Sequence, residues 1–147
     1  MFSAVLDPES ERPDLGVLVV RLGRALLAAE RPVLAAHAVS MWGYIVLGAL
    51  AEEPMRTQAA LARAIGADKT RIIATLDELQ ERALIEREPD PGDRRVRLLR
   101  LTAAGRDLHA AVRAGIRAAE EEMLREVPAG DRRAFLRVLR HLSPEPD

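Results

Sequence analysis

The stretch between residues 57 and 105 restricts the possible folds of this 147-residue chain more than any other part. Thr57 and Asp68 are residue types that cap helix N-termini, and Gly66 between them is of the type that ends helices. Two short helices with a tight corner are therefore predicted. The second, over about residues 69–82, would bury one apolar stripe made of Ile72, Leu76 and Leu79. This spacing is what a helix-turn-helix requires, although other helix corners share it.

A β-hairpin is predicted directly after the second helix. Leu84 and Ile85 begin a strand, residues 89–93 (PDPGD) form a dense turn signal, and residues 96–101 return as a second strand. A hairpin in this position is a wing. Thr102 is expected to cap the next helix, and Gly105 would let that helix pack closely against its neighbours. The fold class is accordingly mainly α with a small β-hairpin wing, a winged helix-turn-helix over residues 40–101.

Basic residues occupy the two places where such a unit would meet DNA. Lys69, Thr70 and Arg71 open the second helix, where side chains can reach base edges or phosphates in a major groove. Arg94 and Arg95 lie at the hairpin tip, and guanidinium groups on a narrow loop suit the negative potential of a minor groove. These five residues are the predicted DNA-binding set.

Asp93 is out of place at a tip that faces phosphates. We expect this carboxylate to have a structural role, in which it pairs with an arginine, either Arg87 or Arg95, and orients the arginine side chain. Asp93 and Arg87 are therefore predicted as residues that orient the wing.

The run DRRVRLLRLTAAG, residues 93–105, resembles the wing signature of the MarR family of bacterial transcriptional regulators: Asp-x-Arg, a short strand, then Leu-Thr-x-x-Gly. Asp68-Lys69-Thr70, and Leu84-Ile85 followed by Arg87, match the same pattern upstream. The resemblance is close over about residues 40–105 and extends to both ends by helix layout only. It implies a winged-helix homodimer that binds pseudo-palindromic operators and is often released by a small ligand.

The chain departs from the family pattern at three places. Ile73 and Ala74 stand where a polar pair usually faces the groove, which leaves more of the readout to the start of the helix. Ala83 replaces the usual glycine at the helix end and, at positive φ, would cost about 1 kcal/mol. Arg97 and Leu98 are exchanged relative to the usual alternation, so the facing of the second strand stays open.

The two ends of the chain are predicted to pair two copies of the winged unit within a single domain of 147 residues. Dimerisation helices are expected over residues 14–38, with Asp14 as cap and Pro32 as an interruption or kink, and over residues 102–142, with Asp131 capping the last helix. Ser40 would cap a helix over residues 41–51 that is apolar nearly all round and hence central. The terminal helices offer more apolar surface than the winged unit can cover, which favours an isologous dimer.

Composition excludes several classes of protein. The net charge of −1 means that DNA binding would depend on local basic patches, and without cysteine there is no disulfide or thiolate metal site. His37, His109 and His141 have no metal-ligand spacing, and no phosphate loop or nucleophile motif is present, so we expect no metal, no cofactor and no enzyme. Residues 1–11 lack the apolar segment of a signal peptide, and no apolar run reaches the roughly 20 residues of a membrane span, so a cytoplasmic protein is expected.

A small-molecule pocket is predicted near the junction of the dimerisation helices and the winged unit. Trp42, Tyr44 and His37 are the polar-aromatic residues there, and they suit a phenolic or planar aromatic ligand. The alternative is that they are ordinary core, interface or helix-end residues. The predicted function is a sequence-specific DNA-binding regulator, more a repressor than an activator, acting on double-stranded DNA as a homodimer with a small-molecule effector. The competing interpretation is a winged-helix protein–protein adaptor.

Overall fold

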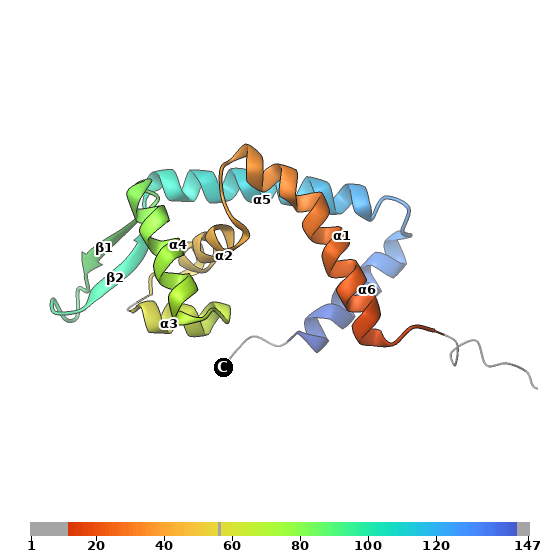
Figure 1. Ribbon diagram of the computed structural model, residues 1–147, viewed down its shortest axis with the longest axis horizontal. Coiled ribbons are helices and arrows are strands. Elements are labelled where there is room, and N and C mark those ends of the chain that lie inside the picture. The colour runs from red at the N-terminus through yellow and green to blue at the C-terminus, as the bar shows by residue number, and fades with distance from the viewer. Residues whose placement is uncertain (1–11, 56, 144–147) are drawn as a thin grey trace, which may run out of the picture.

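The computed structural model describes residues 12–55 and 57–143 (Figure 1). Residues 1–11, to which the signal-peptide prediction refers, lie outside this range. Within it the chain forms six helices and one two-stranded antiparallel sheet, which confirms the predicted fold class. The elements are α1 (Leu15–Ala36), α2 (Met41–Glu52), α3 (Gln58–Ile65), α4 (Lys69–Glu81), β1 (Ile85–Pro89), β2 (Arg97–Leu101), α5 (Ala103–Met123) and α6 (Ala129–Leu142).

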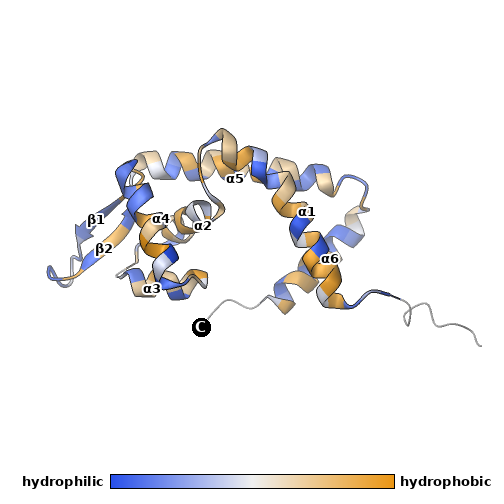
Figure 2. Ribbon diagram, in the orientation of Figure 1, coloured by the Kyte–Doolittle hydropathy of each residue, from blue (hydrophilic) through white to orange (hydrophobic). Residues whose placement is uncertain are grey.

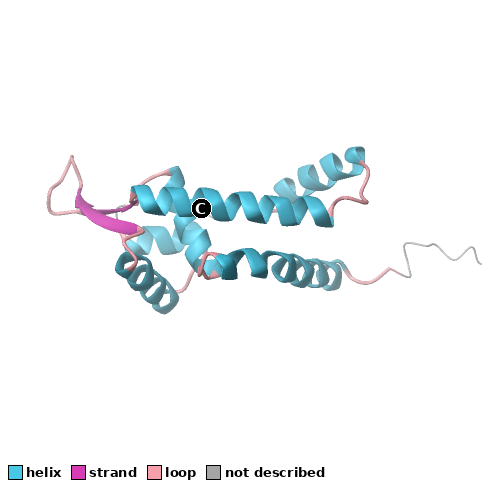
Figure 3. Ribbon diagram, turned by 90° about the horizontal axis from the view of Figure 1, so that it is seen from above, coloured by secondary structure: helices cyan, strands magenta, loops and turns pink. Residues whose placement is uncertain are grey.

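The helices divide into two groups joined by the long helix α5. Figure 1 shows α2, α3, α4 and the hairpin gathered at one end of α5, with α6 at the other. Seen from above, α1 lies alongside α5 and packs against it (Figure 3). Among the described residues, none of the helices taken alone has the length and apolar character needed to cross a membrane. Helices α1 and α2 reach that length and composition only when they are counted together, and they are bent by 80° relative to each other.

Side-chain caps fix four of the helix starts, as predicted. Each cap oxygen accepts a hydrogen bond from a backbone N–H three residues later, at 2.8–3.0 Å; the pairs are Ser40–Gly43, Thr57–Ala60, Asp68–Arg71 and Thr102–Gly105. Such caps satisfy donors that the helix itself leaves without a partner. At its C-terminal end, α3 stops at Gly66, which has the left-handed conformation with φ at 65°.

The predicted cap at Asp131 is wrong, and the cap at Asp14 is confirmed in position only. Asp14 occupies the N-cap position of α1 but makes no side-chain cap hydrogen bond. Asp131 lies within the first turn of α6, which begins at Ala129 after Pro128. Proline lacks an N–H and has φ fixed near the helical value, so it suits a helix start and moves this one earlier than an Asp131 cap would. Helix α1 continues through Pro32, so the predicted interruption is absent, and the kink given as its alternative stays a prediction.

The core lies inside the winged unit, with α2 at its centre as predicted. Its buried residues come from α2, α3, α4, both strands and the residue before β1: Val46, Leu47, Leu50, Leu61, Ile72, Leu76, Leu79, Leu84, Ile85, Leu99 and Leu101. A smaller cluster of Leu34, Val112 and Ile116 joins α1 to α5. The burial of Leu99 and Leu101 settles the facing of β2, because alternate residues of a strand point to opposite faces.

Two backbone positions fix how the winged unit meets α5. A Cβ added to Gly105 would lie 2.0 Å from the carbonyl oxygen of Leu84, so only glycine allows this approach. Ala83, between α4 and β1, has φ at 55°, so the condition under which a strain cost was expected there is met. Ala38, after α1, has φ at 50° and was not singled out by its sequence context.

Candidate nucleic-acid interface

The N-terminal turn of α4 presents its basic residues to solvent. Lys69, Thr70 and Arg71 are exposed, whereas Ile72 is buried and fixes the helix on the core. The positive end of the helix dipole adds to the charges of Lys69 and Arg71. This turn can therefore meet phosphates or base edges. Further along the exposed face Ile73, which is 38% exposed, and Ala74 add no polar group.

Trp42 lies beside this turn rather than with Tyr44. The Cζ atom of Arg71 sits 5.2 Å from the centroid of the Trp42 ring, a cation–π distance. Trp42 is the second residue of α2, so the start of α2 meets the start of α4 through these two side chains.

The wing tip is built on two aspartates. Asp90 is buried; its carboxylate accepts from the backbone N–H of Gly92 at 2.8 Å, and its own N–H donates to Val96 at 2.8 Å. Asp93 accepts from Nε of Arg95 at 3.2 Å and from its backbone N–H at 3.1 Å. The prediction that Asp93 pairs with an arginine is confirmed for Arg95, whose side chain is 91% exposed. Asp90 was not identified as a wing residue from the sequence, although PDPGD contains its turn signal.

Arg87 belongs to a groove between the wing and the start of α3. Its Nη1 donates to Oε1 of Gln80 at 2.9 Å. The groove has a volume of about 480 Å3 and is lined by Thr57, Gln58, Arg87, Arg95, Val96, Arg97 and Leu99. Three arginines beside a helix N-terminus make it suited to a phosphate backbone. Arg97 and Gln58 were missed because their proximity depends on the packing of α3 against the hairpin.

A pocket between α2 and α5 contains Tyr44. The rings of Tyr44 and His109 stack at 5.4 Å between centroids, and the pocket, of about 360 Å3, also includes Arg113 and Arg117. Burial and the charge of Arg113 lower the pKa of His109, and burial raises the pKa of Tyr44. Two arginines and two aromatic rings can hold a planar anion. The spacing of His109, Arg113 and Arg117 on one helix face was the sequence signal for this site, and it was missed.

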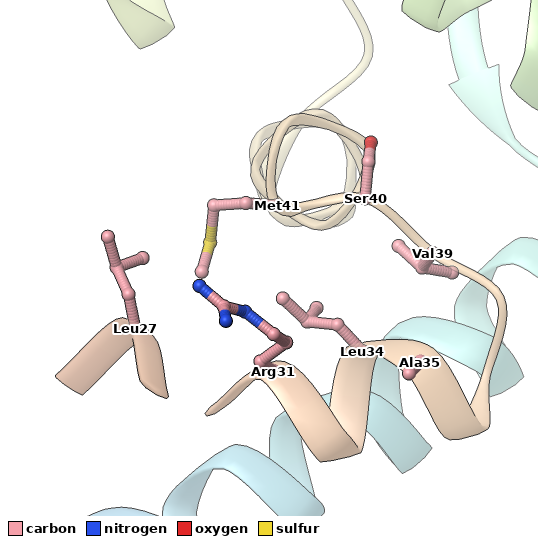
Figure 4. Close-up of a pocket in the computed structure, with 7 residues that line it drawn as sticks. All are labelled: Leu27, Arg31, Leu34, Ala35, Val39, Ser40 and Met41. Carbon is pink, nitrogen blue, oxygen red and sulfur yellow. The ribbon is translucent and has the colours of Figure 1, made fainter. Parts of the chain in front are cut away.

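A second pocket, of about 400 Å3, lies between the end of α1 and the start of α2 (Figure 4). It is lined by Leu27, Arg31, Leu34, Ala35, Val39, Ser40 and Met41, and the guanidinium of Arg31 points into it. His37 lines neither pocket; its carbonyl oxygen accepts from Nη2 of Arg82 at 3.3 Å. The structure thus separates these three residues: Tyr44 lines the pocket between α2 and α5, Trp42 contacts Arg71, and the carbonyl of His37 accepts from Arg82.

Comparison with known proteins identifies the chain's relatives. The sequence model of the MarR family matches residues 42–96 of this chain. The transcriptional regulator HosA of Escherichia coli is 31% identical over 99 residues, which are 67% of this chain and 73% of HosA. The chain belongs to the MarR family. The transcriptional repressor NicR of Pseudomonas putida is 33% identical over 67% of this chain, and the match spans 63% of NicR's length.

Solved structures of other MarR-family proteins are similar to this chain over most of its length. The Mycobacterium tuberculosis protein Rv2887 in complex with DNA superposes with a TM-score of 0.78 at 26% identity, covering 90% of this chain and 100% of that one. Its complex with salicylic acid gives a TM-score of 0.76 at 26% identity, covering 91% and 99%. About nine tenths of the chain is covered, so the likeness of this MarR-family chain extends beyond residues 42–96.

Proposed function

We propose that this MarR-family chain is a homodimeric transcriptional repressor that grips a pseudo-palindromic operator and is released by a small aromatic anion. The observation that carries the proposal is the exposed basic turn Lys69–Thr70–Arg71 on the same winged unit as the arginine-tipped hairpin. One element is suited to a major groove and the other to a flanking minor groove. Arg94, exposed beside Arg95, is assigned to the same contact.

The terminal helices supply the dimer in this proposal. In the described part of the chain, α6 buries none of its residues, and large apolar side chains on it are exposed: Phe135, Leu136, Val138, Leu139 and Leu142. Helix α1 exposes Leu15, Val17, Leu18, Val19, Val20 and Leu27, and Figure 2 shows apolar residues along both helices. Apolar surface on this scale is costly in water. A second copy with the same faces would cover it about a two-fold axis and space two α4 helices on one duplex.

The effector site in this proposal is the pocket between α2 and α5. Rv2887 is known in complex with salicylic acid, a planar aromatic carboxylate. In this chain Arg113 and Arg117 would bind a carboxylate, and the stacked Tyr44 and His109 would provide a flat face for the ring. A ligand there lies against α2, which carries the winged unit's core, so occupancy of the site can alter the placement of α4.

Two further assignments complete the proposal. The chain acts on DNA without catalysing a reaction, and it works in the cytoplasm, where a bacterial chromosome is accessible.

The chemistry of the exposed faces argues against the adaptor interpretation. Three arginines line the groove between α3 and the wing. Binding to a phosphate backbone requires such positive charge, whereas a protein–protein adaptor does not.

The test is a binding titration with labelled duplexes. The best duplex recovered from a random-sequence pool and a shuffled duplex of the same composition are titrated by fluorescence anisotropy at one fixed salt concentration. We expect the protein to bind the selected duplex at least about 10³-fold more tightly than the shuffled one. The selected duplex should contain an inverted repeat, and addition of salicylate should release it from the protein. Equal affinity for the two duplexes, or a monomer in sedimentation, contradicts the proposal.

A further inference from the structure

Trp42 is not placed as a core anchor. Its neighbours along α2, Val46 and Leu47, are completely buried, whereas Trp42 is only partly buried. Its ring faces the guanidinium of Arg71, with 5.2 Å between Cζ and the ring centroid. Trp42 is a large aromatic residue at the edge of the core, and it contacts an exposed cation on another helix. Its position is therefore better explained by an effect on that cation than by core packing.

The guanidinium of Arg71 is held from a second side by Asp68. The carboxylate of Asp68 caps α4 by accepting from the backbone N–H of Arg71 at 2.8 Å, and its Oδ2 lies 3.7 Å from Nε of the same residue. Stacking occupies a face of the guanidinium group, and the N–H donors lie in its plane and can still reach an acceptor. Arg71 is 52% exposed, so its donors can meet a ligand without the stack being broken.

We propose that Trp42 is a positioning residue for DNA recognition, which holds Arg71 in the orientation that meets the operator. The inference rests on the proposed function. A free arginine side chain loses considerable rotamer entropy when it is ordered on DNA, and a stacked one has lost much of that freedom beforehand. Arg71 carries more of the readout here than it would in a helix with polar residues at positions 73 and 74, because Ile73 and Ala74 offer no hydrogen bond.

A double-mutant cycle on operator affinity tests the inference. Trp42→Leu fills space without an aromatic face, Trp42→Phe keeps a face, and Arg71→Ala removes the cation. With the selected duplex described above, we expect Trp42→Leu to weaken binding by about three- to tenfold, the range of a cation–π contact. Trp42→Phe should recover most of that loss, and Trp42→Leu should change affinity less than twofold when Arg71→Ala is already present. An equal loss in both backgrounds, tighter binding by Trp42→Leu, or no change overturns the inference.

Fluorescence provides a second readout that a purely structural role would not affect. Trp42 is the only tryptophan, so its emission reports on the stack. We expect Arg71→Ala to shift the emission of the free protein. Saturation of the wild-type protein with the duplex should not produce the same shift, because Arg71 stays stacked on Trp42. A duplex-induced shift equal to that of Arg71→Ala overturns the inference. This arm needs no substitution of Trp42, so it stands if Trp42→Leu fails to fold.

The two levels of proposal fail in different ways. A wild-type protein that binds selected and shuffled duplexes equally contradicts the proposed function, and this inference with it. A wild-type protein that discriminates between them, combined with additive effects of Trp42→Leu and Arg71→Ala, contradicts the positioning role alone. Thermal unfolding and sedimentation of each variant show whether a loss of affinity follows from a loss of the folded dimer.

Discussion

Nη1 of Arg82 lies 2.6 Å from the carbonyl oxygen of Ala38, and this hydrogen bond ties the end of α4 to the end of α1. Nη2 of the same side chain donates to His37 at 3.3 Å. At its other end, α4 meets the start of α2 through Arg71 and Trp42. The proposed recognition helix is thus attached at one end to the residues that follow α1 and at the other to the start of α2, so its position depends on where these two helices are held.

The first prediction concerns this attachment. Arg82→Gln should lower the free energy of unfolding by about 1–2 kcal/mol, because two backbone carbonyls lose a charged donor. Urea unfolding provides the measurement. Arg125→Gln is the control: its ion pairs with Glu122 and Glu126 are on the surface, and their loss should cost less than about 0.5 kcal/mol. Equal effects of the two substitutions would refute the role given to Arg82.

Ala83→Gly should stabilise the protein by about 1 kcal/mol, since glycine accepts a positive φ without steric cost. The hydrogen bonds at this helix end come from backbone atoms, Ala83 N–H to Gln80 and Leu84 N–H to Leu79, both at 2.9 Å, and glycine retains them. Ala74→Gly, in the exposed middle of α4, is the matched control and should destabilise by about 1 kcal/mol. Thermal melts of the two variants should move in opposite directions; a lower melting temperature for both contradicts the prediction.

Gly105→Ala should destabilise the fold severely, by about 3 kcal/mol or more, because the new methyl group would meet the carbonyl oxygen of Leu84 and backbone atoms cannot move aside as a side chain can. Denaturant titration measures the effect. Gly92→Ala, in the wing loop, adds the same methyl group 3.4 Å from Asp90 and should change stability by less than about 0.5 kcal/mol. A Gly105→Ala variant as stable as Gly92→Ala would mean that the α5–hairpin junction can adjust.

The parts of this structure that could be predicted from sequence are those set by neighbouring residues. Thr57, Asp68 and Thr102 cap helices through groups three positions away, so their roles follow from local pattern. Competition between local signals already defeats this approach at Asp131, where Pro128 starts the helix first.

The site was harder to predict because its members meet only through tertiary packing. The pocket of Tyr44 is completed by His109 and Arg113, from a helix that follows the whole winged unit in sequence. Trp42 and Tyr44 are two positions apart on α2 and therefore face different directions, Trp42 toward Arg71 and Tyr44 toward α5. Proximity in sequence suggested one aromatic cluster, whereas the helix geometry separates its members.

Stability should depend on pH through His109. Burial and Arg113 lower its pKa in the folded state, so the unfolded chain takes up a proton first as the pH falls below the ordinary value of about 6.5. Stability is then lost from that pH down to the folded-state pKa, below which the loss levels off. Unfolding free energies of the wild-type protein and His109→Gln over this range provide the test. The wild-type protein should fall more steeply, and parallel curves would contradict the assignment.

The last prediction concerns the wing. Arg95 is held by Asp93 yet 91% exposed, so its guanidinium is ordered without being covered. Arg95→Ala should weaken operator binding by about 1–3 kcal/mol and reduce the salt dependence of affinity by about one counterion, because one arginine contact to DNA is lost. Arg125→Ala removes the same charge at the end of α5 remote from the hairpin and should leave affinity unchanged (Figure 1). If both substitutions weaken binding equally, net charge accounts for the effect and the wing has no specific contact.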